Sequence, residues 1–178
     1  MTPTAPSFRI AITAAAGTAA AVLGFQQLGA QAFAGHDSNA PVNYAADRIE
    51  LQDKQKRVVL SGNVDVTQGD LRLRAARTTV AYSDGDSLRI QRMDATGGVL
   101  VTRGSESARS DVAIYDFNKR IINMVGNVRL NRANGDNLNG GRIVIDLNSG
   151  VSSVVGSARP GGGAGGRVSG TFAVPKRD

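Results

Sequence analysis

The first informative stretch is Arg57–Tyr82, RVVLSGNVDVTQGDLRLRAARTTVAY. Its first half alternates apolar and polar side chains on both sides of Gly62, which is the period-two pattern of a half-buried strand. An isolated glycine inside such a pattern is typical of a bulge or a bend. A turn is expected at Thr67–Asp70. The stretch therefore predicts an antiparallel pair of strands with one apolar and one polar face.

The second half of the stretch returns with its arginines on the polar face. Leu71–Ala75 reads Leu-Arg-Leu-Arg-Ala, which predicts that Arg72 and Arg74 point towards solvent. Up to Ala75 the apolar residues of this alternation stand at odd-numbered positions, whereas after Ala76 they stand at even-numbered ones, Val80 and Tyr82. This shift predicts a kink or a short connection that starts a third strand.

The same pattern occurs again later in the chain. Ile121–Leu130 aligns with Val58–Val66 through Gly126-Asn127-Val128 against Gly62-Asn63-Val64, and Ala46–Ile49 aligns in the same register with Ser110–Ala113. A fixed period of this kind indicates one β unit stacked on itself. Two looser copies are Asp94–Val101 and Val154–Gly156.

Composition limits the kind of core and the kind of chemistry. The chain has 178 residues, 41% hydrophobic residues, 4% aromatic residues and no Trp or Cys. Burial must therefore come from Val, Leu, Ile and Ala, which suit a pleated sheet. The absence of cysteine excludes disulfides, thiolate metal sites and cysteine nucleophiles.

The formal net charge of +6 is not concentrated in the repeats. Residues 35–155 contain 16 Lys and Arg against 14 Asp and Glu, and the excess lies in Arg9 and in the C-terminal residues. Strand arginines that alternate with apolar residues are most simply a solvated face. Because no aromatic residues are interleaved with them for base stacking, the pattern argues against nucleic acid as a partner.

Residues 1–34 are predicted to be a secretory signal peptide. Arg9 supplies the positive segment, Ile10–Leu23 the apolar segment, and Ala32-Phe33-Ala34 a small-x-small cleavage site, so the mature chain is expected to start at Gly35. The alternative is an uncleaved membrane anchor, although the apolar run is shorter than the ~20 residues of a spanning helix. Cleavage after Ala34 is therefore the favoured reading.

The remaining chain divides into three parts. Residues 35–43 are expected to be a flexible lead-in, residues 44–155 an all-β antiparallel roll of about ten to fourteen short strands, and residues 156–178 a Gly-rich flexible tail. No 3.6-residue apolar periodicity indicates a helix in the middle part. The turn signals that separate its strands are Gln52–Lys54, Gln68–Asp70, Ser83–Asp86, Arg103–Ser105, Phe117–Lys119, Asn134–Asp136 and Asn148–Gly150.

Motifs for catalysis and metal binding are missing. His36 is the single histidine, so neither a catalytic triad nor a zinc site can be assembled. Gly161–Gly166 matches a phosphate-binding glycine pattern as a string, but no strand–helix unit surrounds it. Asp84-Gly85-Asp86 lacks the other ligands of a calcium loop. We therefore predict no catalytic residues, no metal and no cofactor.

Three phrases of the sequence resemble the OstA-like (LptA) family of periplasmic lipopolysaccharide-transport proteins. They are Ala46–Leu51, Leu60–Gly69 and Leu71–Ala75, and the resemblance extends over about Tyr44–Val155. It implies an antiparallel β-jellyroll, open at both ends, whose apolar interior carries the acyl chains of lipopolysaccharide from the inner to the outer membrane. The family often has an acidic residue where this chain has Ala76-Arg77.

The resemblance also implies partners and a binding groove. The expected partners are the lipid A acyl chains of lipopolysaccharide, an LptC-like inner-membrane component and an LptD-like outer-membrane component, and the expected compartment is the periplasm. If the apolar residues of each alternating strand face inward, they line the groove. These residues are Leu60, Val64, Val66, Leu73, Val99, Val101, Val112, Ile114, Ile122, Met124, Val128, Leu130, Ile143 and Ile145.

Three alternatives remain open at this point. The chain could be a structural or adhesive β-solenoid with a fully self-packed interior, the LptC-type anchored component of the same pathway, or an enzyme. The first strand, about Tyr44–Leu51, and the last, about Ile143–Val155, contain no proline and little charge. Unprotected edges recruit further strands, so we expect head-to-tail self-association through them.

Overall fold

The computed structural model describes residue 33 and residues 35–85, 87–156 and 166–173. The expected signal peptide, residues 1–34, therefore lies outside the described residues except for Phe33. Within the described part of the chain, no helix has the length and apolar character needed to cross a membrane.

The described residues form ten antiparallel strands and one short 3-10 helix. This confirms the all-β prediction and its strand number. The elements are β1 Val42–Ala45, β2 Arg48–Gln52, η1 Asp53–Gln55, β3 Arg57–Gln68, β4 Leu71–Asp84, β5 Leu88–Arg103, β6 Glu106–Asp116, β7 Ile121–Asn131, β8 Asn137–Asp146, β9 Ser152–Val155 and β10 Ser169–Thr171.

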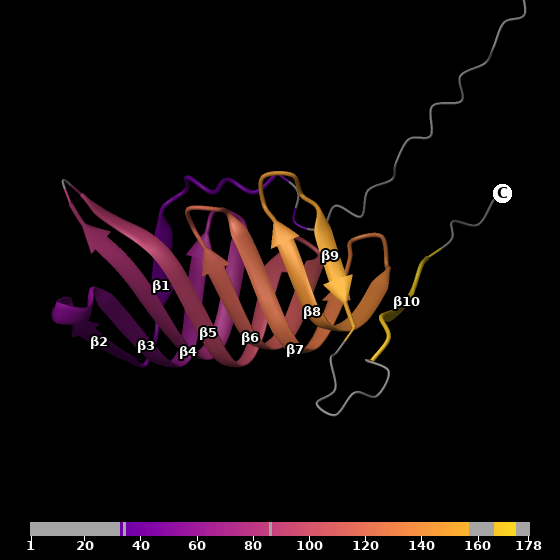
Figure 1. The fold of residues 1–178 in the computed structure, drawn as a ribbon, viewed down its shortest axis with the longest axis horizontal. Coiled ribbons are helices and arrows are strands. Elements are labelled where there is room, and N and C mark those ends of the chain that lie inside the picture. The colour runs from indigo at the N-terminus through magenta and orange to yellow at the C-terminus, as the bar shows by residue number, and fades with distance from the viewer. Residues whose placement is uncertain (1–32, 34, 86, 157–165, 174–178) are drawn as a thin grey trace, which may run out of the picture.

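All strands belong to one open sheet, in the order β1-β3-β4-β5-β6-β7-β8-β10. At one end β1 and β2 pair with the two halves of β3, and at the other end β10 and β9 pair with the two halves of β8. Figure 1 shows the strands stacked along the long axis of the molecule. Each predicted turn falls between two of these strands.

The long strands bend in the middle, and the bends turn the sheet into a roll. The β3–β4 register shifts between Ser61 and Val64, as Gly62 predicts, and similar shifts occur in each following pair up to β7–β8. The parity change after Ala76 is one of these bulges. The expectation of a separate third strand there is therefore wrong, because β4 runs through the bulge without interruption.

A repeated contact supports these bends. Asp47 lies against Gly62, and its Oδ2 accepts a hydrogen bond of 2.9 Å from Nδ2 of Asn63. The second copy of the repeat has the same bond, again 2.9 Å, from Asn127 to Asp111. We call each such contact a clasp. The register that aligned the two copies in the sequence is thereby confirmed in the fold.

The core lies between the two halves of the bent strands. The residues predicted to face inward are all buried in it except Val112 and Ile114, which are only half-buried. Their prediction is wrong because the bulge between Arg109 and Val112 reverses the parity of β6. Ala113 and Tyr115 face the interior instead.

The C-terminal residues are not unstructured throughout, contrary to expectation. Residues 157–165 and 174–178 lie outside the described residues, but Ser169–Thr171 form β10 and pair with Asn137–Asn139 of β8. β9 pairs with the other half of β8. The edge of β8 that we expected to be open is therefore covered by the chain itself.

Deleting Gly161–Asp178 should leave the melting temperature nearly unchanged. The described residues 167–173 are all exposed, so their deletion removes a short backbone ladder, the hydrogen bond from the Ala173 nitrogen to Asp136 and almost no buried apolar surface. Thermal unfolding of the full and shortened chains measures the difference. A fall of many degrees would show that the tail stabilises the roll.

Candidate functional site

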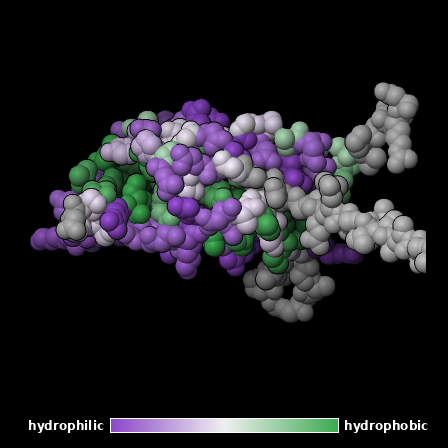
Figure 2. All heavy atoms as spheres, turned by 90° about the horizontal axis from the view of Figure 1, so that it is seen from above, coloured by the Kyte–Doolittle hydropathy of each residue, from purple (hydrophilic) through white to green (hydrophobic). Residues whose placement is uncertain are grey.

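An open apolar cavity of about 230 Å³ lies at the end of the roll formed by β2, β3 and the β4–β5 hairpin. Figure 2 shows apolar side chains gathered there between hydrophilic borders. Both halves of β3 contribute to its wall, through Leu60 before the bulge and Val66 after it. The bend at Gly62 therefore creates the cavity, because it turns two segments of one strand towards each other.

Several large apolar side chains at the mouth of this cavity are exposed to solvent. The exposed fractions are 56% for Tyr44, 67% for Leu51 and 66% for Leu88. They come from β1, β2 and the start of β5. A concentrated apolar surface of this kind, bordered by polar residues, is typical of a binding site.

The rim of the mouth is polar and ties the hairpin to η1. Lys56 forms an ion pair with Asp84, and the hydroxyl of Tyr82 donates to Oδ1 of Asp53 over 3.2 Å. The hydrogen bond with Asp84 raises the pKa of Lys56, and burial together with the Asp53 contact raises the pKa of Tyr82. Charged groups thus surround an apolar interior, an arrangement suited to an amphiphile.

Towards the middle of the roll the interior narrows. A second cavity of only about 20 Å³ shares Val42, Val66 and Met93 with the first. The rings of Tyr115 and Phe117 stack beside it with centroids 4.0 Å apart. The sequence has few aromatic residues, but these two fill the interior at the point where the open cavity ends.

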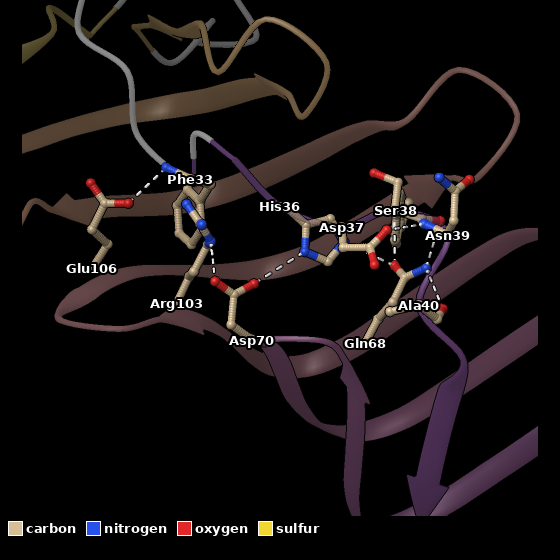
Figure 3. A network of polar contacts seen from close by, with 11 residues as sticks. Phe33, His36, Asp37, Ser38, Asn39, Ala40, Gln68, Asp70, Arg103 and Glu106 are labelled. Carbon is tan, nitrogen blue, oxygen red and sulfur yellow. Dashed lines mark hydrogen bonds and ion pairs between the residues drawn. The ribbon is translucent and has the colours of Figure 1, made fainter.

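Residues 35–40 form a strap that closes this part of the roll, as Figures 1 and 3 show. The Gln68 side chain at the end of β3 holds it, because its Nε2 donates to the carbonyl oxygens of Ser38 at 2.9 Å and Ala40 at 3.1 Å. The Tyr115 hydroxyl donates to the Oε1 of Gln68 over 3.0 Å. The expectation that residues 35–43 are a flexible lead-in is therefore wrong.

His36 anchors the strap a second time. It is buried, and its Nε2 lies 3.1 Å from Oε1 of Gln68 while its Nδ1 lies 3.4 Å from Oδ1 of Asp70 (Figure 3). Arg103 donates to the other oxygen of Asp70 over 2.7 Å. Partial burial alone raises the pKa of Asp70, but the hydrogen bonds from His36 and Arg103 outweigh it and hold that pKa below its usual value.

We expect Asp70→Asn to loosen the strap in a pH-dependent way. Because the folded-state pKa is lowered, the ionised carboxyl stabilises the fold above the unfolded pKa of about 3.9, and this contribution disappears as pH falls through the folded pKa. At half exposure the effect is at most about 1 kcal/mol. Melting temperatures from about pH 7 to pH 2 should converge for the two proteins; a constant gap would contradict the prediction.

The structure brings together only part of the predicted groove. Leu60 and Val66 line the open cavity, and Val66, Leu73, Val101 and Ile122 line the small one. The remaining buried members of the prediction pack in the core: Val64, Val99, Met124, Val128, Leu130, Ile143 and Ile145.

Sequence reasoning missed the mouth residues Tyr44, Leu51 and Leu88. The alternation shift to Val80 and Tyr82 marks two other residues that line the same cavity, but no local pattern singles out the three mouth residues. In the described ranges no three His, Cys, Asp or Glu residues lie close enough to hold a metal ion.

Comparisons with known proteins agree with this geometry. The family described as LptA/(LptD N-terminal domain) LPS transport protein matches residues 44–151. An uncharacterized protein of Rhizobium meliloti (strain 1021) is 25% identical over 95 residues, which cover 50% of this chain and about half, 51%, of that protein.

A solved structure has the same fold. It is LptH of Pseudomonas aeruginosa, described as the LptA homologous periplasmic component of the lipopolysaccharide transport device. The TM-score is 0.66 at 19% sequence identity, over 78% of this chain and 99% of that one. The likeness confirms the predicted jellyroll.

Proposed function

Because the chain belongs to the LptA/(LptD N-terminal domain) family of LPS transport proteins, we propose that its open apolar cavity binds the lipid A acyl chains of lipopolysaccharide. The protein then shields these chains from water and carries lipopolysaccharide from the inner to the outer membrane. The proposed compartment is the periplasm, where LptH is described to act.

The exposed mouth is the observation that supports this proposal most. Burying one methylene group stabilises by about 0.8 kcal/mol, so an acyl chain of about twelve carbons gains on the order of 9 kcal/mol when it leaves water. Tyr44, Leu51 and Leu88 hold apolar surface in solvent at the same place. When an acyl chain contacts these side chains, the apolar surface of the chain and that of the mouth both leave water.

The rim suits the other part of the ligand. Lys56 stands at the mouth, where it forms an ion pair with Asp84. In this proposal a phosphate of the lipid A headgroup lies beside Lys56 when the acyl chains enter the cavity. The proposal thus places a charged headgroup at the rim and acyl chains inside.

We propose the partners on the basis of the sheet edges. An LptC-like inner-membrane component and an LptD-like outer-membrane component would pair with opposite ends of the roll, and further copies of the chain would pair head-to-tail. The edge strands offered for this pairing are β1 and β2 at one end and β9 and β10 at the other. The exposed Leu51 and Val155 lie on these strands.

Site-specific photo-crosslinking in cells tests the proposal. A photoreactive residue at Tyr44, Leu51 or Leu88 should form an adduct with lipopolysaccharide. The matched control positions are Val125 and Ile114, which lie on the outer face of the sheet, and no adduct is expected there. Equal labelling at the mouth and on the outer face would overturn the assignment.

Charge at the mouth should separate binding from folding. Leu51→Asp and Leu88→Asp place a carboxylate beside the entering chains, so we expect at least a tenfold or so loss of lipopolysaccharide binding. Both residues are mostly exposed, so the melting temperature should change little. Val125→Asp is the control, because it adds the same charge on the outer face. Normal binding by the mouth variants would contradict the proposal.

A structural β-solenoid is the second candidate, and one observation favours it. The interior beyond Met93 is closely filled, with a cavity of only about 20 Å³. If this packing extended to the mouth in solution, purified protein would bind no lipopolysaccharide. Mass spectrometry of the protein purified from the periplasm distinguishes the candidates, because bound lipopolysaccharide is expected only from the transport protein.

A further inference from the structure

Phe33 is part of the folded domain although it lies within the expected signal peptide. Its side chain has 0% exposure and belongs to the buried core cluster. Its backbone nitrogen donates to Oε2 of Glu106 over 2.7 Å (Figure 3). A residue removed with a leader has no reason to be held at both its side chain and its backbone.

The backbone of Phe33 points to the place where the chain begins after export. Its φ is +65°, which is unfavourable for a non-glycine residue inside a chain. Part of that cost comes from the carbonyl oxygen of the preceding residue. The first residue of a chain has no preceding carbonyl, so the conformation of Phe33 is relaxed if the chain starts there.

The sequence offers a cleavage site at this position. Ala30-Gln31-Ala32 is a small-x-small triplet that ends immediately before Phe33. The triplet Ala32-Phe33-Ala34 also fits, but cleavage after it would remove Phe33 from the core and take away the donor that Glu106 accepts from. Burial and hydrogen bonding therefore favour the first triplet.

We propose that the leader is cleaved between Ala32 and Phe33, and that the new α-ammonium group of Phe33 forms an ion pair with Glu106. A leader peptidase, an endopeptidase of the membrane, breaks the Ala32–Phe33 peptide bond with one water molecule. The hydroxyl of the water goes to the carbonyl carbon of Ala32 and a proton goes to the nitrogen of Phe33. Protonation of that amine at neutral pH gives the cation.

The contact places the nitrogen of Phe33 directly on the Glu106 carboxylate, with an N–H···O distance of 2.7 Å at the short end of the range. An α-ammonium group at this nitrogen would therefore stand within ion-pair distance of Glu106. The other charged or titratable groups on the elements packed here are Arg103 of β5, Asp70 of the β3–β4 turn and His36 of the strap. The new N-terminus at Phe33 is then anchored by Glu106 two residues before the strap begins, and the strap itself is anchored at His36.

Intact mass and N-terminal sequencing of the protein purified from the periplasm test the cleavage position. We expect the chain to begin Phe-Ala-Gly-His. A mass lower by one phenylalanine and one alanine, with the sequence Gly-His-Asp-Ser, would overturn the proposal. Retention of residues 1–32 would overturn it as well.

A matched pair of variants checks the same point. Ala30→Glu places a charged residue in the proposed triplet and should block cleavage, whereas Ala34→Glu should be processed at the same bond as the unmodified chain. Cleavage after Ala34 predicts the opposite result for both variants.

The ion pair has a pH signature that a peptide N–H lacks. A carboxylate partner raises the folded-state pKa of an α-amino group, so its contribution is full below the unfolded pKa of about 7.7–8.0 and is lost as pH rises through the folded pKa. We expect the processed protein to melt several degrees above its Glu106→Gln variant at about pH 7, with a smaller gap at about pH 9.5. A gap that stays constant over this range would overturn the ion pair.

Discussion

Ile145→Ala should destabilise the roll by about 2–5 kcal/mol, the usual range for truncating a fully buried isoleucine. Ile145 lies on β8, has 0% exposure and is paired with Ile122 of β7. Truncation removes three methylene equivalents of packing and leaves a void that the rigid ladder of β7 and β8 cannot easily close. Urea unfolding at an unchanged m value measures the loss.

The matched control is Ile114→Ala in β6. Ile114 is half-buried on the outer face, opposite Asp94 and Asn123 of the neighbouring strands, so its truncation should cost under about 1 kcal/mol. The comparison uses one residue type in one sheet. If both substitutions lowered the free energy of unfolding equally, Ile114 would lie in the core, as the sequence alternation suggested.

Gly126→Ala should cost about 2–3 kcal/mol, the second large effect. Gly126 has a φ of +83°, and an added Cβ would come within 2.3 Å of Oδ2 of Asp111. The left-handed conformation costs ~1–2 kcal/mol for alanine, and displacing Asp111 breaks its hydrogen bond to Asn127, worth ~1 kcal/mol. Thermal and urea unfolding of the variant measure the sum.

Gly98→Ala separates the two contributions. Its φ of +76° is similar, but no heavy atom lies within 4 Å of an added Cβ. Only the backbone cost should remain, so Gly98→Ala should be clearly milder. In an Asp111→Ala background the excess cost of Gly126→Ala should be largely removed, since the carboxyl group that collides at 2.3 Å and the hydrogen bond are absent and only the Cβ contact at 3.0 Å remains. The clasp would be excluded as the cause if the same loss were measured for Gly126→Ala, for Gly98→Ala and for Gly126→Ala in the Asp111→Ala background.

The sequence was most informative where glycine and alternation coincide. Gly62 and Gly126 marked their bulges because a single glycine stands out against β-branched neighbours, and the flanking turns carried Gly, Asn or Asp. These are local signals, so they specified the strands, the turns and the repeat without knowledge of the tertiary contacts.

The error at Val112 and Ile114 has a physical reason. The bulge of β6 falls at Ser110-Asp111 and contains no glycine, so nothing in the sequence announces the change of parity. In the following segment, 112–115, the even-numbered and the odd-numbered residues are both apolar, so alternation alone does not tell which set faces the interior. The prediction placed the larger side chains, Val112 and Ile114, in the interior. In the structure Ala113 lies there instead, beside the bulky residues of adjacent strands.

The strap and the mouth depend on contacts between distant residues. His36 and Gln68 are 32 positions apart, and neither belongs to a periodic pattern that would suggest burial. The mouth residues Tyr44 and Leu88 come from different strands that meet only after the sheet has bent. Alternation identifies which face is apolar, but the bend decides where that face stays open to solvent.

The stacking of bent strands also sets the length of the molecule. The path from β1 to β10 takes seven steps between neighbouring strands. At about 4.8 Å for each step, the roll measures roughly 34 Å, close to the thickness of the ~30 Å hydrocarbon core of one bilayer. The two clasps are four strands apart, or about 19 Å. The length of the roll therefore depends on the number of its strands. One more bent hairpin between the clasps would lengthen the roll by about 10 Å and leave both of its ends unchanged.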